Sequence, residues 1–171
     1  FLHPSNHIDV ILGQGTAAIE LLQEQPSLTD ILTPVGGGGL LAGTALAARY
    51  YGSNCQVYAG EPFGADDAYR SMQSGKIEYN TSVNTVADGL RTHLGDKNFP
   101  IIKTLVTEII RVEEQEIVAA MKLLWERLKI IIEPSCAVAF AALLKDKKTF
   151  SGKKIGIILS GGNVDLTNLP F

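Results

Sequence analysis

The chain has 171 residues, of which 46% are hydrophobic and 19% are charged, and its formal net charge is −3. This length and composition exclude a disordered chain and suffice for one domain with its own hydrophobic core. The basic residues are scattered, which excludes the positive stripe of a nucleic-acid-binding protein and the basic face of a membrane-surface helix.

Two further classes of protein are excluded by single features of the sequence. Cys55 and Cys136 are the only cysteines, so there is neither a disulfide framework nor a zinc-ligand spacing, and we expect a cytoplasmic protein. The longest uncharged stretch, residues 31–48, is nearly long enough to span a bilayer, but Pro34 and four glycines interrupt it. We therefore expect neither a membrane nor a nucleic acid among its partners. Because the first residue is Phe1 rather than methionine, we expect the chain to be part of a longer protein.

Strand-like and helix-like patterns alternate along most of the chain. The first half predicts helices over residues 16–25, 40–51 and 65–73, strands over residues 31–35 and 56–59, and a turn at Gly13 and Gly15. The second half predicts a loop over residues 76–88, helices over 100–106, 113–129 and 134–144, and strands over 108–112 and 154–159. The sequence thus predicts an α/β fold with one mainly parallel, twisted sheet and helices on both faces.

Four consecutive glycines, Gly36, Gly37, Gly38 and Gly39, join a predicted strand to a predicted helix. Glycines allow backbone N–H groups to converge on an anion, and the N-terminus of the following helix adds a partial positive charge. This loop therefore predicts a phosphate-binding site.

A dinucleotide is one candidate for that phosphate. Gly37, Gly39 and Ala42 fit the dinucleotide-binding pattern, and Glu61 follows the next strand at about the expected distance of ~20 residues. Pro62, directly after the acid, weakens this match. A nucleotide (NAD)-dependent oxidoreductase domain is therefore an alternative interpretation.

A second glycine-containing loop, Ser160-Gly161-Gly162-Asn163, follows the last predicted strand. In open α/β sheets ligands bind at this carboxyl edge of the strands. The Ser160 hydroxyl can hydrogen-bond a ring nitrogen but, unlike a carboxylate, does not hold that nitrogen strongly protonated. The two loops together indicate a ligand with a phosphate at one end and a heterocycle at the other.

Five motifs occur in the order seen in fold-type II pyridoxal-phosphate (PLP) enzymes. They are Gly13-Gln14-Gly15-Thr16, Pro34-Val35-Gly36-Gly37-Gly38-Gly39-Leu40, Ala87-Asp88-Gly89, Glu133-Pro134-Ser135 and Ser160-Gly161-Gly162-Asn163-Val164-Asp165-Leu166. Over nearly its whole length the chain resembles the serine racemase and serine/threonine (hydroxyaspartate) dehydratase branch. The resemblance implies that residues 1–171 are the C-terminal part of a PLP-binding large domain with the tryptophan synthase β-like fold.

The resemblance also implies a function for the whole protein and roles for particular residues. The function is a serine racemase or an ammonia-lyase of L-serine, threonine or hydroxyaspartate, acting on a small amino acid as a homodimer. Residues 36–39 and the Leu40 amide would hold the PLP phosphate. Ser160 would face the pyridine nitrogen, and Gly89 would lie close to the cofactor.

Two regulatory sites are implied in the same way. Glu61 and Asp67 carboxylates with the Ala65 carbonyl resemble the divalent-cation site of the serine racemase branch, and hard oxygen ligands of this kind suit Mg²⁺ or Ca²⁺. Racemases of this branch are activated by ATP at a subunit interface, and Lys129 and Asn163 match positions involved there.

One feature of the family is missing. Its Schiff-base lysine lies in a Ser-x-Lys-type motif upstream of the glycine loop, and none of the lysines here has that context. The small substrate domain is absent as well. We therefore predict no catalytic residue in this chain and no activity of the chain alone. A non-catalytic PLP- or phosphate-binding module is a further alternative.

Overall fold

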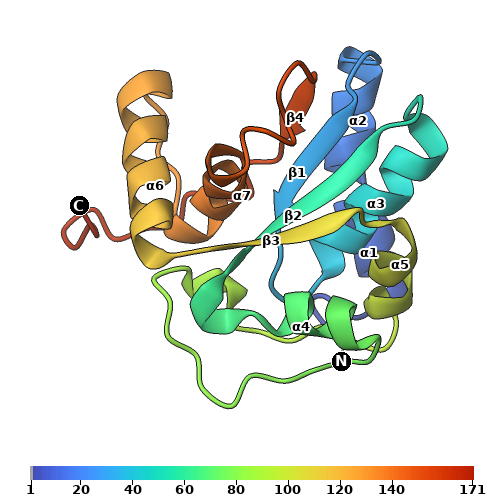
Figure 1. Cartoon of the computed structure of the whole chain (residues 1–171), viewed down its shortest axis with the longest axis horizontal. Coiled ribbons are helices and arrows are strands. Elements are labelled where there is room, and N and C mark those ends of the chain that lie inside the picture. Colours follow the sequence, from blue (N-terminus) through green and yellow to red (C-terminus); the bar gives the residue numbers. More distant parts are fainter. Residues whose placement is uncertain (1) are drawn as a thin grey trace.

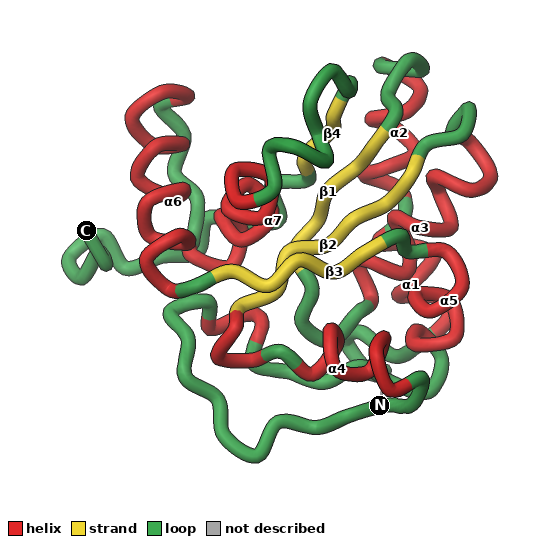
Figure 2. Tube along the Cα trace, viewed as in Figure 1, coloured by secondary structure: helices red, strands yellow, loops and turns green. Residues whose placement is uncertain are grey.

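The computed structural model describes residues 2–171 and is built around one twisted sheet of four strands (Figures 1 and 2). The strands are β1 (Asp30–Pro34), β2 (Gln56–Pro62), β3 (Glu108–Val112) and β4 (Ile155–Ile157), in the spatial order β3-β2-β1-β4. Every pairing is parallel. The prediction of a parallel sheet is confirmed, and the carboxyl ends of all four strands therefore meet at one edge.

Helices cover both faces of the sheet, as expected for a parallel sheet with continuously apolar strands (Figure 1). On one face α6 (Glu114–Leu128) and α7 (Pro134–Lys145) bury Leu32 and Tyr58. On the other face are α1 (Ile8–Gln14), α2 (Thr16–Glu24), α3 (Gly39–Tyr51) and α5 (Asn98–Leu105). Val57 and Ala59 point toward that second group, so neighbouring residues of β2 alternate between the two cores.

Short elements complete the fold around the carboxyl ends of the strands. They are the 3₁₀ turns η1 (Phe63–Ala65) and η2 (Asp88–Leu90) and the helix α4 (Asp67–Ser74). Within residues 2–171 no helix is both long and apolar enough to cross a membrane.

The predicted helix over residues 113–129 matches α6 and its two caps. The Glu113 carboxylate accepts a backbone N–H of the first turn while Glu116 accepts the N–H of Glu113, which together form a capping box. Lys129 ends the helix in the left-handed conformation, with φ 59°. Pro134 is the first residue of α7, where its missing N–H costs nothing.

The structure corrects several predicted boundaries. Residues 8–14 form the helix α1, which was not predicted, so Gly13 lies inside a helix and only Gly15 forms the junction with α2. The strand β2 extends to Pro62 rather than Ala59, which places Glu61 in the strand and not in the loop after it. The helix α5 begins at Asn98 rather than Pro100, and β4 covers only three residues.

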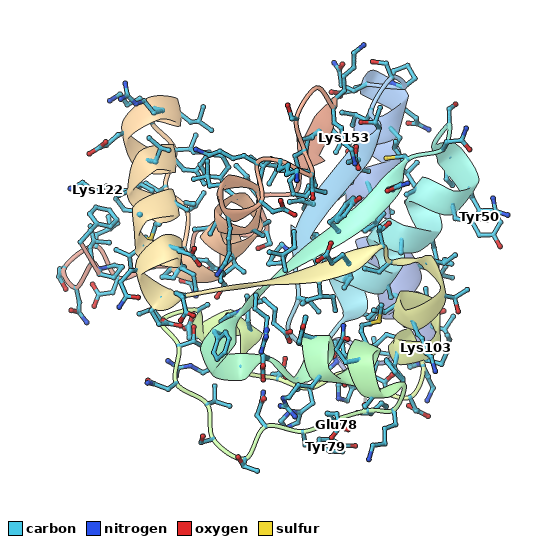
Figure 3. The ribbon with its side chains drawn as sticks, viewed as in Figure 1. Tyr50, Glu78, Tyr79, Lys103, Lys122 and Lys153 are labelled. Atoms are coloured by element: carbon cyan, nitrogen blue, oxygen red, sulfur yellow. The ribbon has the colours of Figure 1, made fainter. Side chains whose placement is uncertain are left out.

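An ion pair fastens the segment before β4 to the start of β1 (Figure 3). The Lys153 ammonium lies 2.9 Å from the Asp30 carboxylate, of which only 1% is exposed. The same ammonium sits over the rings of Tyr58 and Phe150, 5.3 and 5.9 Å from their centres. This cluster lies at the amino end of the sheet and has a structural role.

Cys55 offers a test of the electrostatics at this end. Burial, and secondarily the negative charge of Asp30, raise the pKa of the Cys55 thiol to about 11. Because the thiolate is the reactive form, we expect iodoacetamide to alkylate Cys55 at pH 8 at least about tenfold more slowly than an unhindered cysteine peptide. The rate should rise about tenfold per pH unit up to about pH 10, measured by mass spectrometry with Cys55→Ser as the assignment control. A plateau already at pH 9 would contradict the raised pKa.

Candidate functional site

The four-glycine loop turns the chain from β1 into α3. Gly38 has φ 83°, a left-handed conformation that disfavours any residue with a Cβ. Gly38 also packs closely, because a Cβ there would lie 2.6 Å from the Leu94 side chain. The first N–H groups of α3, which begins at Gly39, have no partner inside the helix, and no side chain caps them. The loop therefore has the open backbone donors that an anion site requires.

Three loops that are distant in sequence surround one cavity of about 300 Å³. The predicted cofactor-binding residues all line it, namely Gly36, Gly37, Gly38, Gly39, Leu40, Gly89 and Ser160. We call this cavity the cofactor pocket. Its volume is at the lower end of the range for small-molecule sites, and its glycine wall leaves room for a phosphate.

The N-terminus of α7 ties the Gly89 and Ser160 loops together. The Ser135 hydroxyl accepts the N–H of Gly89 at 3.0 Å. The Glu133 carboxylate accepts the N–H of Asn163 at 3.0 Å, and the N–H of Glu133 donates to the Gly161 carbonyl at 3.1 Å. Glu133 and Ser135 also line the cofactor pocket. Their motif is visible in the sequence, but this role depends on contacts with residues far along the chain.

A larger cavity of about 840 Å³ adjoins the cofactor pocket and shares Pro4, Ser5, Gly37 and Gly89 with it. Its other lining residues are mostly polar: His3, Asn6, Ile77, Tyr79, Arg91, Thr92, His93, Leu94, Gly95 and Asp96. A second small polar molecule therefore fits beside the cofactor pocket. We call this second space the adjoining cavity.

A family model described as pyridoxal-phosphate dependent enzyme matches residues 1–161. The chain belongs to this PLP-dependent enzyme family. The match includes every motif loop that lines the cofactor pocket.

Similar proteins and solved structures agree with this family. A serine racemase of Dictyostelium discoideum is 53% identical over 98% of this chain and 53% of its own length. A beta-hydroxyaspartate dehydratase of Paracoccus denitrificans is 46% identical over the whole chain and 54% of its own length. The structure of maize serine racemase superposes with a TM-score of 0.92 and 46% identity, over 96% of this chain and 52% of that one. The chain thus spans about half the length of the relatives it matches.

In the alternative interpretation as an NAD-binding domain, Glu61 would be the acid that binds the ribose. The PLP family has no need of that role, and the contacts of Glu61 do not fit it. Its side chain is 1% exposed, and its two carboxylate oxygens accept the N–H groups of Ala68 and Tyr69, each at 2.8 Å. Glu61 therefore caps the first turn of α4 and is not free to bind a ribose. The structure gives no support to an NAD-binding site.

Glu61, near the end of β2, and Asp67, at the start of α4, lie in the same buried region. Asp67 is 1% exposed and accepts hydrogen bonds from the Asn80 amide at 2.7 Å and the Leu94 N–H at 3.4 Å. Burial raises the pKa of both carboxyl groups, most strongly for Glu61, where the charge of Asp67 adds to the effect. Ala65 is also buried nearby, between β2 and α4.

These residues fit a divalent cation only in part. Each carboxylate oxygen has a second lone pair beyond the hydrogen bond it accepts, and a cation would stabilise the ionised forms that burial disfavours. Within residues 2–171, however, no three His, Cys, Asp or Glu side chains form a cluster that could hold a metal ion. Any ion held by Glu61, Asp67 and the Ala65 carbonyl would need water to complete its coordination.

The two positions implied for ATP are not brought into one cavity. Lys129 is exposed at the end of α6. Asn163 is exposed and lines a cavity of about 550 Å³ with Asp88, Arg91 and Asp165, and Lys129 does not line it.

No lysine among residues 2–171 lines the cofactor pocket. The arrangement can hold a phosphorylated heterocycle, but it offers no amine to bond with it.

Proposed function

We propose that this chain is the cofactor-holding half of a PLP-dependent enzyme that racemises serine or removes ammonia from serine, threonine or hydroxyaspartate. The single observation behind the proposal is the convergence of residues 36–40, Gly89 and Ser160 on one pocket beside a polar cavity. The names of the relatives, serine racemase and beta-hydroxyaspartate dehydratase, support the choice of reaction.

Each wall of the pocket has a role in this proposal. The N–H groups of the glycine loop and of the first turn of α3 bind the phosphate dianion. The Ser160 hydroxyl bonds the ring nitrogen, and Glu133 holds the loop that carries Ser160. When bound, PLP supplies an electron sink for the bond that breaks at the α-carbon of the amino acid. A hydroxyl partner leaves the ring nitrogen largely unprotonated, which suits elimination and racemisation.

The group that binds the cofactor aldehyde and moves the α-proton has to come from outside this chain. In the proposal it is a lysine upstream of Phe1, accompanied by a small substrate domain. We therefore expect no racemase or ammonia-lyase turnover from the 171-residue chain by itself, although the full-length protein should be active. Turnover by the isolated chain would contradict this division of roles.

The proposed function is tested by the intact mass of the full-length protein before and after borohydride reduction. We expect a gain of one pyridoxyl group, mapped by peptide analysis to a lysine outside this chain. Without that gain, and with the whole sequence accounted for, the protein would be a phosphate-binding module rather than an enzyme.

A divalent cation at Glu61, Asp67 and the Ala65 carbonyl is the second part of the proposal. Saturation with Mg²⁺ or Ca²⁺ at about 100 times the Kd should stabilise the folded protein by about 2.7 kcal/mol, or roughly 5–10 °C in melting temperature. Asp67→Asn should abolish this shift.

Asp66→Asn is the matched control for the cation test. Asp66 already pairs with Arg70 at 2.7 Å and Arg111 at 2.8 Å, so it is not offered to a cation and its variant should retain the metal-induced shift. Equal shifts in the Asp67→Asn variant and the wild type would exclude a cation at this site.

The remaining parts of the proposal concern assembly and regulation. We propose a cytoplasmic homodimer in which Lys129 and Asn163 contact ATP across the subunit interface. Sedimentation of the full-length protein, with and without ATP, tests both parts. A protein that is a monomer in both conditions has no interface for the nucleotide.

A further inference from the structure

Asn98, the first residue of α5, is fully buried behind the glycine loop. Its side-chain amide donates to the Gly37 carbonyl at 2.7 Å and to the Ser5 carbonyl at 3.0 Å. Its amide oxygen accepts the N–H of Gly95 at 3.0 Å. Both donors and the acceptor of this amide are therefore used.

The bond to Gly37 fixes one peptide plane of the phosphate loop. The Gly37 carbonyl and the Gly38 N–H belong to the same planar trans peptide, so they point in opposite directions. Holding the carbonyl against Asn98 therefore turns the Gly38 N–H away from Asn98. Gly37 and Gly38 both line the cofactor pocket, whereas Asn98 does not.

The hydrogen bond to the Ser5 carbonyl holds the segment that lies between the two cavities. Ser5 lines both the cofactor pocket and the adjoining cavity. It packs so closely on the loop that a Cβ on Gly39 would lie 3.0 Å from the Ser5 Cα. Asn6 is held separately, since its side chain accepts the N–H of Lys97 at 2.9 Å and donates to Asp96 at 2.7 Å.

We propose that Asn98 is a positioning residue of the phosphate site. It holds the peptide between Gly37 and Gly38 with its N–H directed at the phosphate, and it ties Ser5 to the same loop. The inference rests on the proposed function, because it assumes that the glycine loop binds the PLP phosphate. Beyond that function, one buried amide outside the cofactor pocket, that of Asn98, sets the geometry of the loop.

The test compares PLP with pyridoxal, which lacks the phosphate, in the full-length apoprotein. Both molecules carry the aldehyde and the ring, so only a change in the phosphate site alters the ratio of their dissociation constants. We expect Asn98→Ala to weaken PLP binding at least about tenfold, because it removes three buried hydrogen bonds, those with Gly37, Ser5 and Gly95, and to change pyridoxal binding less than about twofold. Lys103→Ala, on the same helix, is the matched control and should leave both constants unchanged (Figure 3).

The outcomes of this test separate a role of Asn98 in the phosphate site from a role in the stability of the fold. Equal weakening of PLP and pyridoxal binding, or no weakening of either, would show that Asn98 only stabilises the fold. If the wild type does not prefer PLP to pyridoxal, the proposed phosphate site itself is wrong. Asn98→Leu, which keeps the volume but has no donor, replaces the alanine variant if that variant does not fold. In the wild type, inorganic phosphate should also shift the Asn98 side-chain amide resonances, and unchanged resonances would overturn the inference.

Discussion

Gly38→Ala is expected to weaken PLP binding at least about 100-fold and to lower the stability of the fold. With φ at 83°, an alanine at this position costs about 1–2 kcal/mol in backbone strain alone. Its Cβ would also lie 2.6 Å from the Leu94 side chain and 2.9 Å from the Asn98 amide oxygen. Because these neighbours are buried, the loop has to move and its N–H groups lose their convergence. Titration of the full-length apoprotein with PLP and thermal unfolding measure the two effects.

Gly13→Ala is the control for this change. Gly13 lies inside the helix α1 and has no neighbour within 4 Å of an added Cβ. Alanine in a helix interior is favoured over glycine by roughly 0.5–1 kcal/mol, so this variant should be slightly more stable and bind PLP normally. If Gly38→Ala behaved in the same way, the glycine loop could not be the phosphate site.

Glu61→Ala is expected to destabilise the protein by about 3 kcal/mol even without any divalent cation. It removes the acceptors of two backbone N–H groups, those of Ala68 and Tyr69, in a region that is almost fully buried. Each buried donor left without a partner costs about 1–3 kcal/mol. For a chain of this size the loss corresponds to roughly 6–12 °C in melting temperature, measured in EDTA by scanning calorimetry.

Glu126→Ala is the matched control, since Glu126 is an exposed acid on α6 and its removal should change stability by less than about 0.5 kcal/mol. A Glu61→Ala variant that melts like the wild type in EDTA, but no longer responds to Mg²⁺, would show that Glu61 acts only as a metal ligand.

Much of the fold could be predicted because its signals are local. The helix α6 was placed within one residue at each end, since its apolar spacing and the Glu113 and Glu116 pair lie within a few turns. The helix α1 was missed because tertiary packing stabilises it. Ile11 is 1% exposed beneath α3, and Gly43 lets the two helices approach so closely that a Cβ there would collide with the Ile11 carbonyl oxygen.

The candidate site likewise contains residues that local motifs predict and residues whose roles depend on distant contacts. The glycine loop, Gly89 and Ser160 were predicted because each lies in a recognisable motif, and they do line one pocket. The roles of Asn98, Glu133 and Ser135 could not be predicted, because each depends on a partner far along the chain. Asn98 bonds Ser5 across 93 residues, and Ser135 bonds Gly89 across 46. The cation and ATP sites stay predictions.

The pairing of β4 with β1 has a consequence for the order in which the protein assembles. Asp30 lies opposite Ile155, and Lys154 bonds Thr29 across 125 residues. Closing so long a loop costs entropy before any contact is gained, and such distant pairings are slow to form. The Ser160 loop directly follows β4, so during synthesis the glycine loop is made well before the opposite wall of the pocket. A cofactor that needs both walls can therefore bind only at the end of folding, and it stabilises the finished sheet rather than guiding its formation.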